Sequence, residues 1–221
     1  MAHPDDAEFS AGGTIARWVS AGSVVDYCLL TRGDKGTSDP DALSGDVAAV
    51  REREQRAAAA VLGVRSVRFL GYPDGMLENT LALRREIVAV IRELRPAAVI
   101  SSDPTRRYGP TYSNHPDHRA AADATLDAIF PSARDPLAFP ELRRAGLEPH
   151  RVAEVFLSNP TEATVAVDIT TTLEIKIAAL MEHASQVTEE RLRAFLPTRA
   201  ADAGQAAGVE YAELFFRIEL P

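Results

Sequence analysis

Apolar and polar residues alternate along the chain in blocks that have either a helical or a strand-like spacing. Short apolar runs predict buried strands at residues 23–31, 64–71, 97–104, 153–158, 163–169 and 211–220. Apolar residues at helical spacing predict helices at residues 14–21, 47–62, 81–95, 115–130 and 171–185. Strands that alternate with helices of this length indicate an α/β fold, a three-layer sandwich in which helices cover both faces of a mostly parallel sheet.

Composition narrows the class of protein without indicating a reaction. The 221 residues suit one medium-sized domain, and no linker or low-complexity segment divides residues 1–221. The net charge of −8 argues against a nucleic acid or an anionic membrane as a partner. The single cysteine, Cys28, cannot form an internal disulfide, so we expect a cytoplasmic protein.

Two short stretches concentrate the residues that can carry chemistry. "AHPDD" opens the chain, and "HPDH" lies at the start of the predicted helix 115–130, so that His3, His115 and His118 account for three of the five histidines. In parallel α/β sheets ligands bind beyond the carboxyl ends of the strands, and both stretches suit such a position. His115 and His118 are three residues apart and can share one helix face.

A set of histidine and aspartate side chains is typical of zinc hydrolases, which use three protein ligands and leave one position for water. Zinc lowers the pKa of that water to about 7, and a nearby carboxylate can then accept its proton. Asp5 and Asp6 are adjacent and should point in different directions, so one can bind the metal while the other acts as the base. This chemistry predicts three metal ligands and one base: His3, Asp6 and His118 as ligands, and Asp5 as the base.

The remaining polar residues of the second stretch have supporting roles in this prediction. His115 would polarise the substrate or act as an acid, and Asp117 would orient His115. Each stretch alone has a simpler explanation, because carboxylates stabilise a helix N-terminus and a histidine there is often structural. The two together, in a chain with so few histidines, favour the metal site.

The same stretches resemble a known family. "AHPDD" followed by "EFSAGGTI", and later "NHPDHRAA", is similar to the LmbE-like, PIG-L-type N-acetylglucosaminyl deacetylases. The resemblance extends over roughly residues 2–187 through the segments "TRGDKGT", "REREQRAAAAVLG", "LGYPDGML" and "KIAALMEHASQ".

The resemblance implies a Rossmann-like sheet and a divalent metal, usually zinc. It also implies removal of an N-acetyl or other N-acyl group from a small-molecule partner, an amino sugar or a glycoconjugate. Carried over by position, it implies His3, Asp6 and His118 as metal ligands, Asp5 as general base and His115 as the group that stabilises the oxyanion.

Two further residues match family positions. The resemblance implies that Arg51 contacts the sugar and that Asp74 accepts a bond from a sugar hydroxyl. The alternatives are a solvated helix charge for Arg51 and a turn residue for Asp74. His183, in "HASQ", also matches a family pattern, and we expect it to lie at a capped helix end rather than to act in catalysis.

The chain departs from the family at its start, where only Met1 and Ala2 precede His3. Family members normally carry an apolar strand that runs into this turn. We therefore expect a truncated first strand, with Met1 and Ala2 as its last two positions and an apolar run upstream in the source gene. Without that strand the metal site would lose support.

Three functions remain open at this stage. The first is a zinc-dependent N-deacetylase, and the second is a non-catalytic or degenerate relative that only binds a ligand. The third is an amidase that cuts the amide of a sugar-containing conjugate without specificity for acetyl. Nothing in the sequence decides which substrate is used or whether the chain forms a homo-oligomer.

Overall fold

The computed structural model describes residues 1–221, which divide into two compact units. Unit 1 contains residues 1–75 and 164–214, and unit 2 contains residues 76–163 and 215–221. The expected single domain over residues 1–221 stays a prediction, and each unit is described by itself below.

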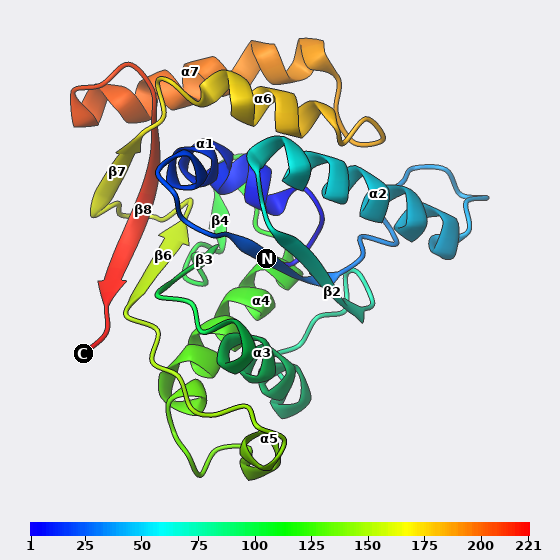
Figure 1. Ribbon diagram of the computed structural model, residues 1–221. Helices are drawn as coiled ribbons and strands as arrows, with labels where there is room; N and C mark the ends of the chain where they lie inside the picture. The colour runs from blue at the N-terminus through cyan, green and yellow to red at the C-terminus, as the bar shows by residue number, and fades with distance from the viewer. The chain divides into compact units, whose positions relative to one another are not determined.

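Unit 1 combines a small parallel sheet with four helices. Its strands are β1 (Asp26–Thr31), β2 (Ser66–Tyr72), β7 (Val165–Asp168) and the first residues of β8 (Ala212–Glu219). Its helices are α1 (Asp6–Ser20), α2 (Ser44–Leu62), α6 (Leu173–Met181) and α7 (Glu189–Ala207). β1 and β2 pair in parallel, while α6 packs on α1, α2 and α7 and lies beside α7 (Figure 1).

The first two residues continue the small sheet of unit 1. The Met1 amino group donates to the Cys28 carbonyl at 2.9 Å, and the Leu30 amide donates to the Met1 carbonyl at 3.0 Å. The Thr31 amide then donates to the Ala2 carbonyl at 2.9 Å. Met1 and Ala2 therefore occupy ladder positions beside β1, as expected.

Helix α1 begins at Asp6, eight residues before the predicted start at Thr14. The sequence pattern misses this first part because Gly12 and Gly13 interrupt the helical spacing. Both glycines are needed for close packing, since a Cβ at Gly13 would lie 2.7 Å from Ile169 and one at Gly12 3.1 Å from Lys176. The early helix start places the HPDD turn directly at a helix N-terminus.

One hydrophobic cluster of unit 1 lies between α6, α7 and the end of β7. It is formed by Ile169, Leu173, Ile177, Leu180, Leu192, Leu196 and Ala200. Helix α7 was not predicted, because Pro197 and a run rich in alanine and glycine obscure it. Its buried residues Leu192, Leu196 and Ala200 recur every four positions, which is the spacing of one helix face.

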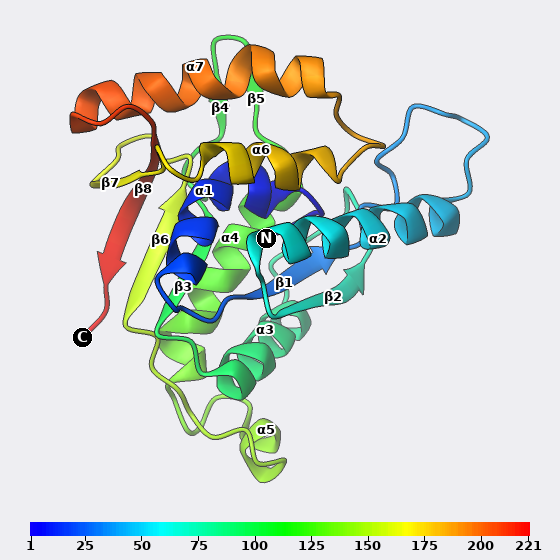
Figure 2. The same ribbon diagram turned by 45° about the horizontal axis from the view of Figure 1, so that its top comes forward.

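Unit 2 carries the second predicted stretch. Its strands are β3 (Ala98–Ser102), β4 (Tyr108–Gly109), β5 (Tyr112–Ser113), β6 (Glu154–Ser158) and the last residues of β8. Its helices are α3 (Leu81–Leu94), α4 (Pro116–Asp127), α5 (Pro140–Arg144) and the π-helical turn η1 (Ala128–Ala133). β3 pairs with β6 in parallel, and α4 packs on α3 and β3. Figure 2 shows β4 and β5 as the two arms of a hairpin.

The α/β class is confirmed, but the expected single, mostly parallel sheet is wrong. β1 and β2 form a pair of their own, β4 and β5 form an antiparallel pair, and β8 runs antiparallel to β6. Apolar runs reveal that a segment is a strand, whereas the direction and partner of that strand depend on contacts far along the chain. None of the helices combines the length and apolarity needed to cross a bilayer.

Candidate metal centre and active site

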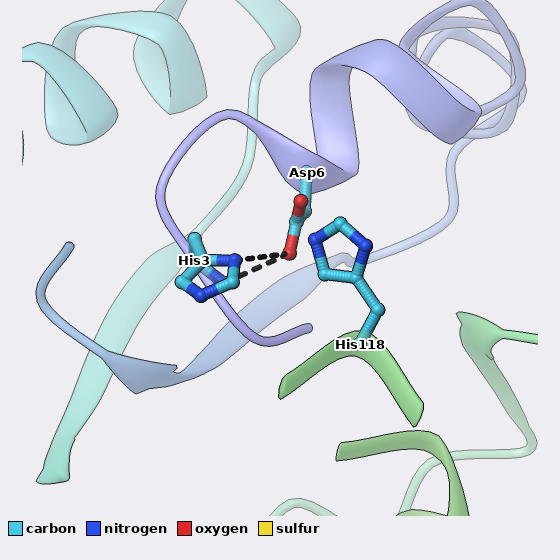
Figure 3. Close-up of side chains that lie close together, drawn as sticks. All are labelled: His3, Asp6 and His118. Atoms are coloured by element: carbon cyan, nitrogen blue, oxygen red, sulfur yellow. Dashed lines mark hydrogen bonds and ion pairs between the residues drawn. The ribbon is translucent and has the colours of Figure 1, made fainter. Parts of the chain in front are cut away.

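His3 leaves the ladder beside β1 and is buried between two carboxylates of unit 1. Its backbone amide donates to Asp6 Oδ2 at 2.8 Å, and its ring atom Nδ1 lies 3.5 Å from the same oxygen (Figure 3). Its other ring nitrogen, Nε2, lies 3.0 Å from Asp74 Oδ1. The imidazole is therefore held from both sides, with the predicted co-ligand Asp6 at Nδ1.

In the absence of metal, the surroundings of His3 favour the protonated form of its imidazole ring. Burial opposes the charged ring, but the bonds to Asp6 and Asp74 outweigh burial and raise the pKa of His3 to about 10. The bond to His3 in turn lowers the pKa of Asp74 to about 2, against the opposing effect of burial. A metal ion bound by His3 would have to replace this proton.

Asp5 is the residue before α1 and has a left-handed backbone, with φ of 82°. Burial and the charge of Asp6 raise the pKa of Asp5 to about 7, although Arg51 and His183 act in the opposite direction. A carboxylate whose pKa is near neutrality can both take up and release a proton at the pH of a cell. Asp5 therefore has the property that a general base requires.

Arg51, on α2, is buried and holds the HPDD turn. Its Nη2 donates to the Pro4 carbonyl at 2.8 Å and to Asp5 Oδ2 at 3.1 Å. The guanidinium lies over Gly33 and Gly36, where a Cβ would come within 2.3 Å and 2.4 Å of Nη1. The glycines of "TRGDKGT" thus make room for Arg51, and the predicted contact of Arg51 with a sugar stays a prediction.

Gln55 also holds this turn and was not identified from the sequence. Its Oε1 accepts from the Asp5 amide at 2.8 Å, and its Nε2 donates to Glu8 Oε1 at 2.8 Å. Gln55 follows Arg51 by four residues on α2, so both side chains leave the same helix face. That spacing in "REREQ" is the signal that could have found Gln55.

His183 lies behind these residues in unit 1. Its side chain is fully buried, with Nε2 3.6 Å from Glu8 Oε2. His183 lies two residues after the end of α6, as expected, but its side chain packs against Glu8. Asp74, predicted to contact substrate, accepts from the Lys35 amide at 3.3 Å besides facing His3. A substrate contact of Asp74 stays a prediction.

In unit 2, His115 is the N-cap residue of α4. The Asp117 amide donates to its Nδ1 at 3.2 Å, and Pro116 occupies the first helical position. Because Nδ1 accepts a hydrogen bond, the proton of the neutral ring is on Nε2. His115 is therefore arranged as a hydrogen-bond donor, which is what the stabilisation of a developing oxyanion needs.

Asp117 is fully buried in the first turn of α4. Its Oδ1 accepts from the Leu77 amide at 3.1 Å, and its own amide binds His115. Asp117 thus fixes His115 through the backbone. Orientation of the His115 ring by the Asp117 carboxylate stays a prediction.

His118 is contributed by the first turn of α4 and is also labelled in Figure 3. Its ring and that of His115 have centroids 5.5 Å apart, so the expectation that they share a helix face is confirmed. His118 Nδ1 lies 3.1 Å from Asn114 Oδ1. Nitrogen from two histidines and oxygen from one aspartate form a donor set that zinc accepts, so the predicted ligands His3, Asp6 and His118 fit such an ion.

An α/β chain with histidine and aspartate gathered after a sheet ladder and at a helix start has the features of a metal-dependent hydrolase. The family model described as "PIG-L: GlcNAc-PI de-N-acetylase" matches residues 1–129. The chain belongs to this PIG-L, or LmbE-like, GlcNAc deacetylase family.

Two curated relatives and one solved structure support this assignment. A diacetylchitobiose deacetylase from Thermococcus kodakarensis is 35% identical over 218 residues, covering 96% of this chain and 78% of the relative. A 1D-myo-inositol 2-acetamido-2-deoxy-α-D-glucopyranoside deacetylase from Rhodococcus erythropolis is 33% identical, covering 85% of this chain and 79% of the relative. The structure of N,N'-diacetylchitobiose deacetylase from Pyrococcus horikoshii with its inhibitor MPG is similar with a TM-score of 0.91 and 30% identity, covering 98% of this chain and 81% of that one.

Proposed function

We propose that this protein is a zinc-dependent N-deacetylase that removes the acetyl group from an N-acetylglucosamine-containing small molecule. The observation that carries the proposal is Asp5, a half-buried carboxylate that accepts from Arg51 Nη2 at 3.1 Å directly beside the His3–Asp6 pair, with its pKa raised to about 7. Membership of a deacetylase family supports the same reaction, and so do the names of the relatives.

The proposed metal ligands are His3 and Asp6, in the HPDD turn, and His118, in the first turn of α4. When bound, zinc would supply a Lewis acid and lower the pKa of water to about 7. Another divalent metal that accepts the same nitrogen and oxygen ligands would serve the same purpose. Because the bonds to Asp6 and Asp74 raise the pKa of His3 to about 10, metal binding through His3 would release a proton.

The other residues of the proposed site move protons and hold charge. Asp5 takes a proton from the attacking water and passes it on to the leaving amine, while Arg51 keeps the Asp5 carboxylate in place. His115 donates from Nε2 to the acyl oxygen as negative charge develops there. Asp117 keeps His115 in the tautomer that can donate.

Acetate release tests the proposal. Zinc-loaded protein is incubated with N-acetylglucosamine, diacetylchitobiose, N-acetylglucosaminyl-inositol and N-acetylglucosaminyl-malate, and acetate and free amine are measured together. We expect equal amounts of both products from at least one substrate, and release that is about 10²–10⁴-fold slower with Asp5→Asn. No release from any of these substrates by zinc-loaded, folded protein would contradict the proposal and favour a ligand-binding relative.

Two parallel assays separate the remaining alternatives. Equal rates with N-acetyl and bulkier N-acyl versions of the preferred sugar would indicate an amidase without specificity for acetyl. Release that persists after removal of metal by a chelator would contradict the zinc dependence. The molar mass of the protein in solution, measured alongside, decides whether a homo-oligomer forms.

A further inference from the structure

We infer that Asn114 is a positioning residue for His118, which sets the tautomer of that ring and connects it to the β4–β5 hairpin. The inference rests on the proposed function in one respect, because it takes His118 to be a metal ligand. Asn114 is buried one residue before the HPDH motif, and no role was predicted for it.

The orientation of the Asn114 amide follows from its partners. Its Nδ2 donates to the Arg106 carbonyl at 2.7 Å, and a carbonyl oxygen can only accept. The amide oxygen must therefore be the atom directed at His118, where Oδ1 lies 3.1 Å from Nδ1. The two contacts together exclude the flipped amide, which would place two acceptors against each other at Arg106.

The tautomer of His118 follows from the amide. An acceptor at Nδ1 requires a proton on Nδ1, which leaves the lone pair of the neutral ring on Nε2. His115, three residues earlier, has the opposite arrangement, because the Asp117 amide donates to its Nδ1. One ring is thereby prepared to bind a metal through Nε2, and the other to donate a hydrogen bond from Nε2.

Asn114 is itself fixed by its neighbours. Its amide donates to the Arg107 carbonyl at 2.8 Å, and its carbonyl accepts from Arg119 Nη1 at 2.6 Å. Arg106 in turn lies over the Tyr112 ring, with 4.6 Å between the guanidinium carbon and the ring centroid. A displacement of the hairpin would therefore be transmitted to the His118 ring through a single residue.

The experiment compares zinc dissociation constants, measured by competition with a chromophoric chelator, in four variants and the wild type. Asn114→Leu removes both side-chain bonds and should weaken zinc binding about 10–100-fold. Asn114→Asp keeps an acceptor at His118 but loses the bond to the Arg106 carbonyl, so it should weaken zinc binding less than Asn114→Leu does. Asn79→Leu is the matched control, because exposed Asn79 bonds to Asp127 at the far end of the same helix, and it should leave affinity unchanged. His118→Ala tests whether His118 is itself a zinc ligand.

The outcomes separate the inference from the proposed function. If His118→Ala binds zinc as tightly as the wild type, His118 is not a ligand and the proposed site is wrong. If His118→Ala loses zinc while Asn114→Leu keeps it, the positioning role of Asn114 is wrong and His118 remains a metal ligand. Nitrogen-15 NMR of the metal-free wild type tests the tautomer without any variant. In the neutral His118 ring we expect the proton on Nδ1, and a proton on Nε2 would overturn the inference.

Discussion

The HPDD turn of unit 1 and the HPDH start of α4 in unit 2 carry similar side chains but are held by different kinds of contact. In the turn, His3 faces Asp74, and Asp5 is held by Arg51 and Gln55, all far away in the sequence. At the helix start, His115 is bound by the Asp117 amide and His118 by Asn114, within four residues.

The difference shows how each group of proposed site residues is held. The helix start fixes His115 within its own first turn and His118 through Asn114, whose amide is oriented by the nearby Arg106 carbonyl, so all of its contacts are close in the sequence. The HPDD turn includes a left-handed Asp5 and a charged, buried His3, both of which are costly unless their partners are in place. Loss of a distant partner should therefore damage the turn more than the helix start.

The largest effect is expected from the base itself. Asp5→Asn keeps the size of the side chain but removes its ability to take up a proton, so kcat should fall about 10²–10⁴-fold. Zinc content and KM should stay near the wild-type values, because Asp5 is not a proposed ligand. Steady-state kinetics together with elemental analysis check this, and a near-normal kcat would show that another group is the base.

His115→Ala should have the next largest effect. Removal of one donor to a developing oxyanion typically lowers kcat about 10²–10³-fold, with a smaller change in KM. His118 should keep its tautomer and zinc its affinity, because the support of the two rings is separate. An increase in KM alone would make His115 a substrate-binding residue instead.

Gly33→Ala tests the long-range support of the turn. The new Cβ would lie 2.3 Å from Arg51 Nη1, and the resulting displacement of Arg51 from Asp5 should lower kcat by up to about 10²-fold. Gly22→Ala is the matched control, since Gly22 also has a positive φ but nothing within 4 Å. Both variants should lose about 1–2 kcal/mol of stability, as measured by denaturant unfolding, and only Gly33→Ala should lose activity. Equal kcat values would show that Asp5 does not depend on Arg51.

Zinc affinity should also depend on pH, by a moderate factor for each pH unit. The folded-state pKa of His3, about 10, lies above its ordinary value of 6.5. Its proton therefore stabilises the metal-free protein fully below pH 6.5, and that stabilisation is lost as the pH rises through 10. Because zinc must displace this proton, affinity should improve about tenfold per pH unit within the window.

Calorimetry in buffers of different protonation enthalpy measures the released proton directly. Asp74→Asn should flatten the pH dependence, because it removes one of the two carboxylates that raise the pKa of His3. A zinc affinity that does not change with pH would show that His3 is already neutral, or that it is not a ligand.

The same contrast explains how much the sequence could predict. The HPDH helix start was predicted with its shared face, because its contacts obey local helical spacing. The β4–β5 hairpin and α7 were missed, since "YGPTYS" reads as a loop and Pro197 interrupts a helical pattern. Gln55 was missed because its partner Asp5 is 50 residues away.

Side-chain roles were harder to predict than elements. Arg51 and Asp74 were predicted to contact the substrate. The contact of Arg51 with Asp5 and that of Asp74 with His3 could not be predicted from their spacing in the sequence. Strand direction was missed for the same physical reason, because the antiparallel register of β8 with β6 joins residues that are far apart in the sequence, such as Ser158 with Phe215 and Glu154 with Glu219.

Zinc binding tests the central assignment most directly. Stoichiometry and Kd are measured for the wild type, Asp6→Ala, His118→Ala and His150→Ala, the last a control that removes a histidine bonded to the Pro96 carbonyl. One zinc per chain is expected for the wild type and His150→Ala, with affinity lost in Asp6→Ala and His118→Ala. Stoichiometric, tight zinc in His118→Ala would contradict a metal site built from His3, Asp6 and His118.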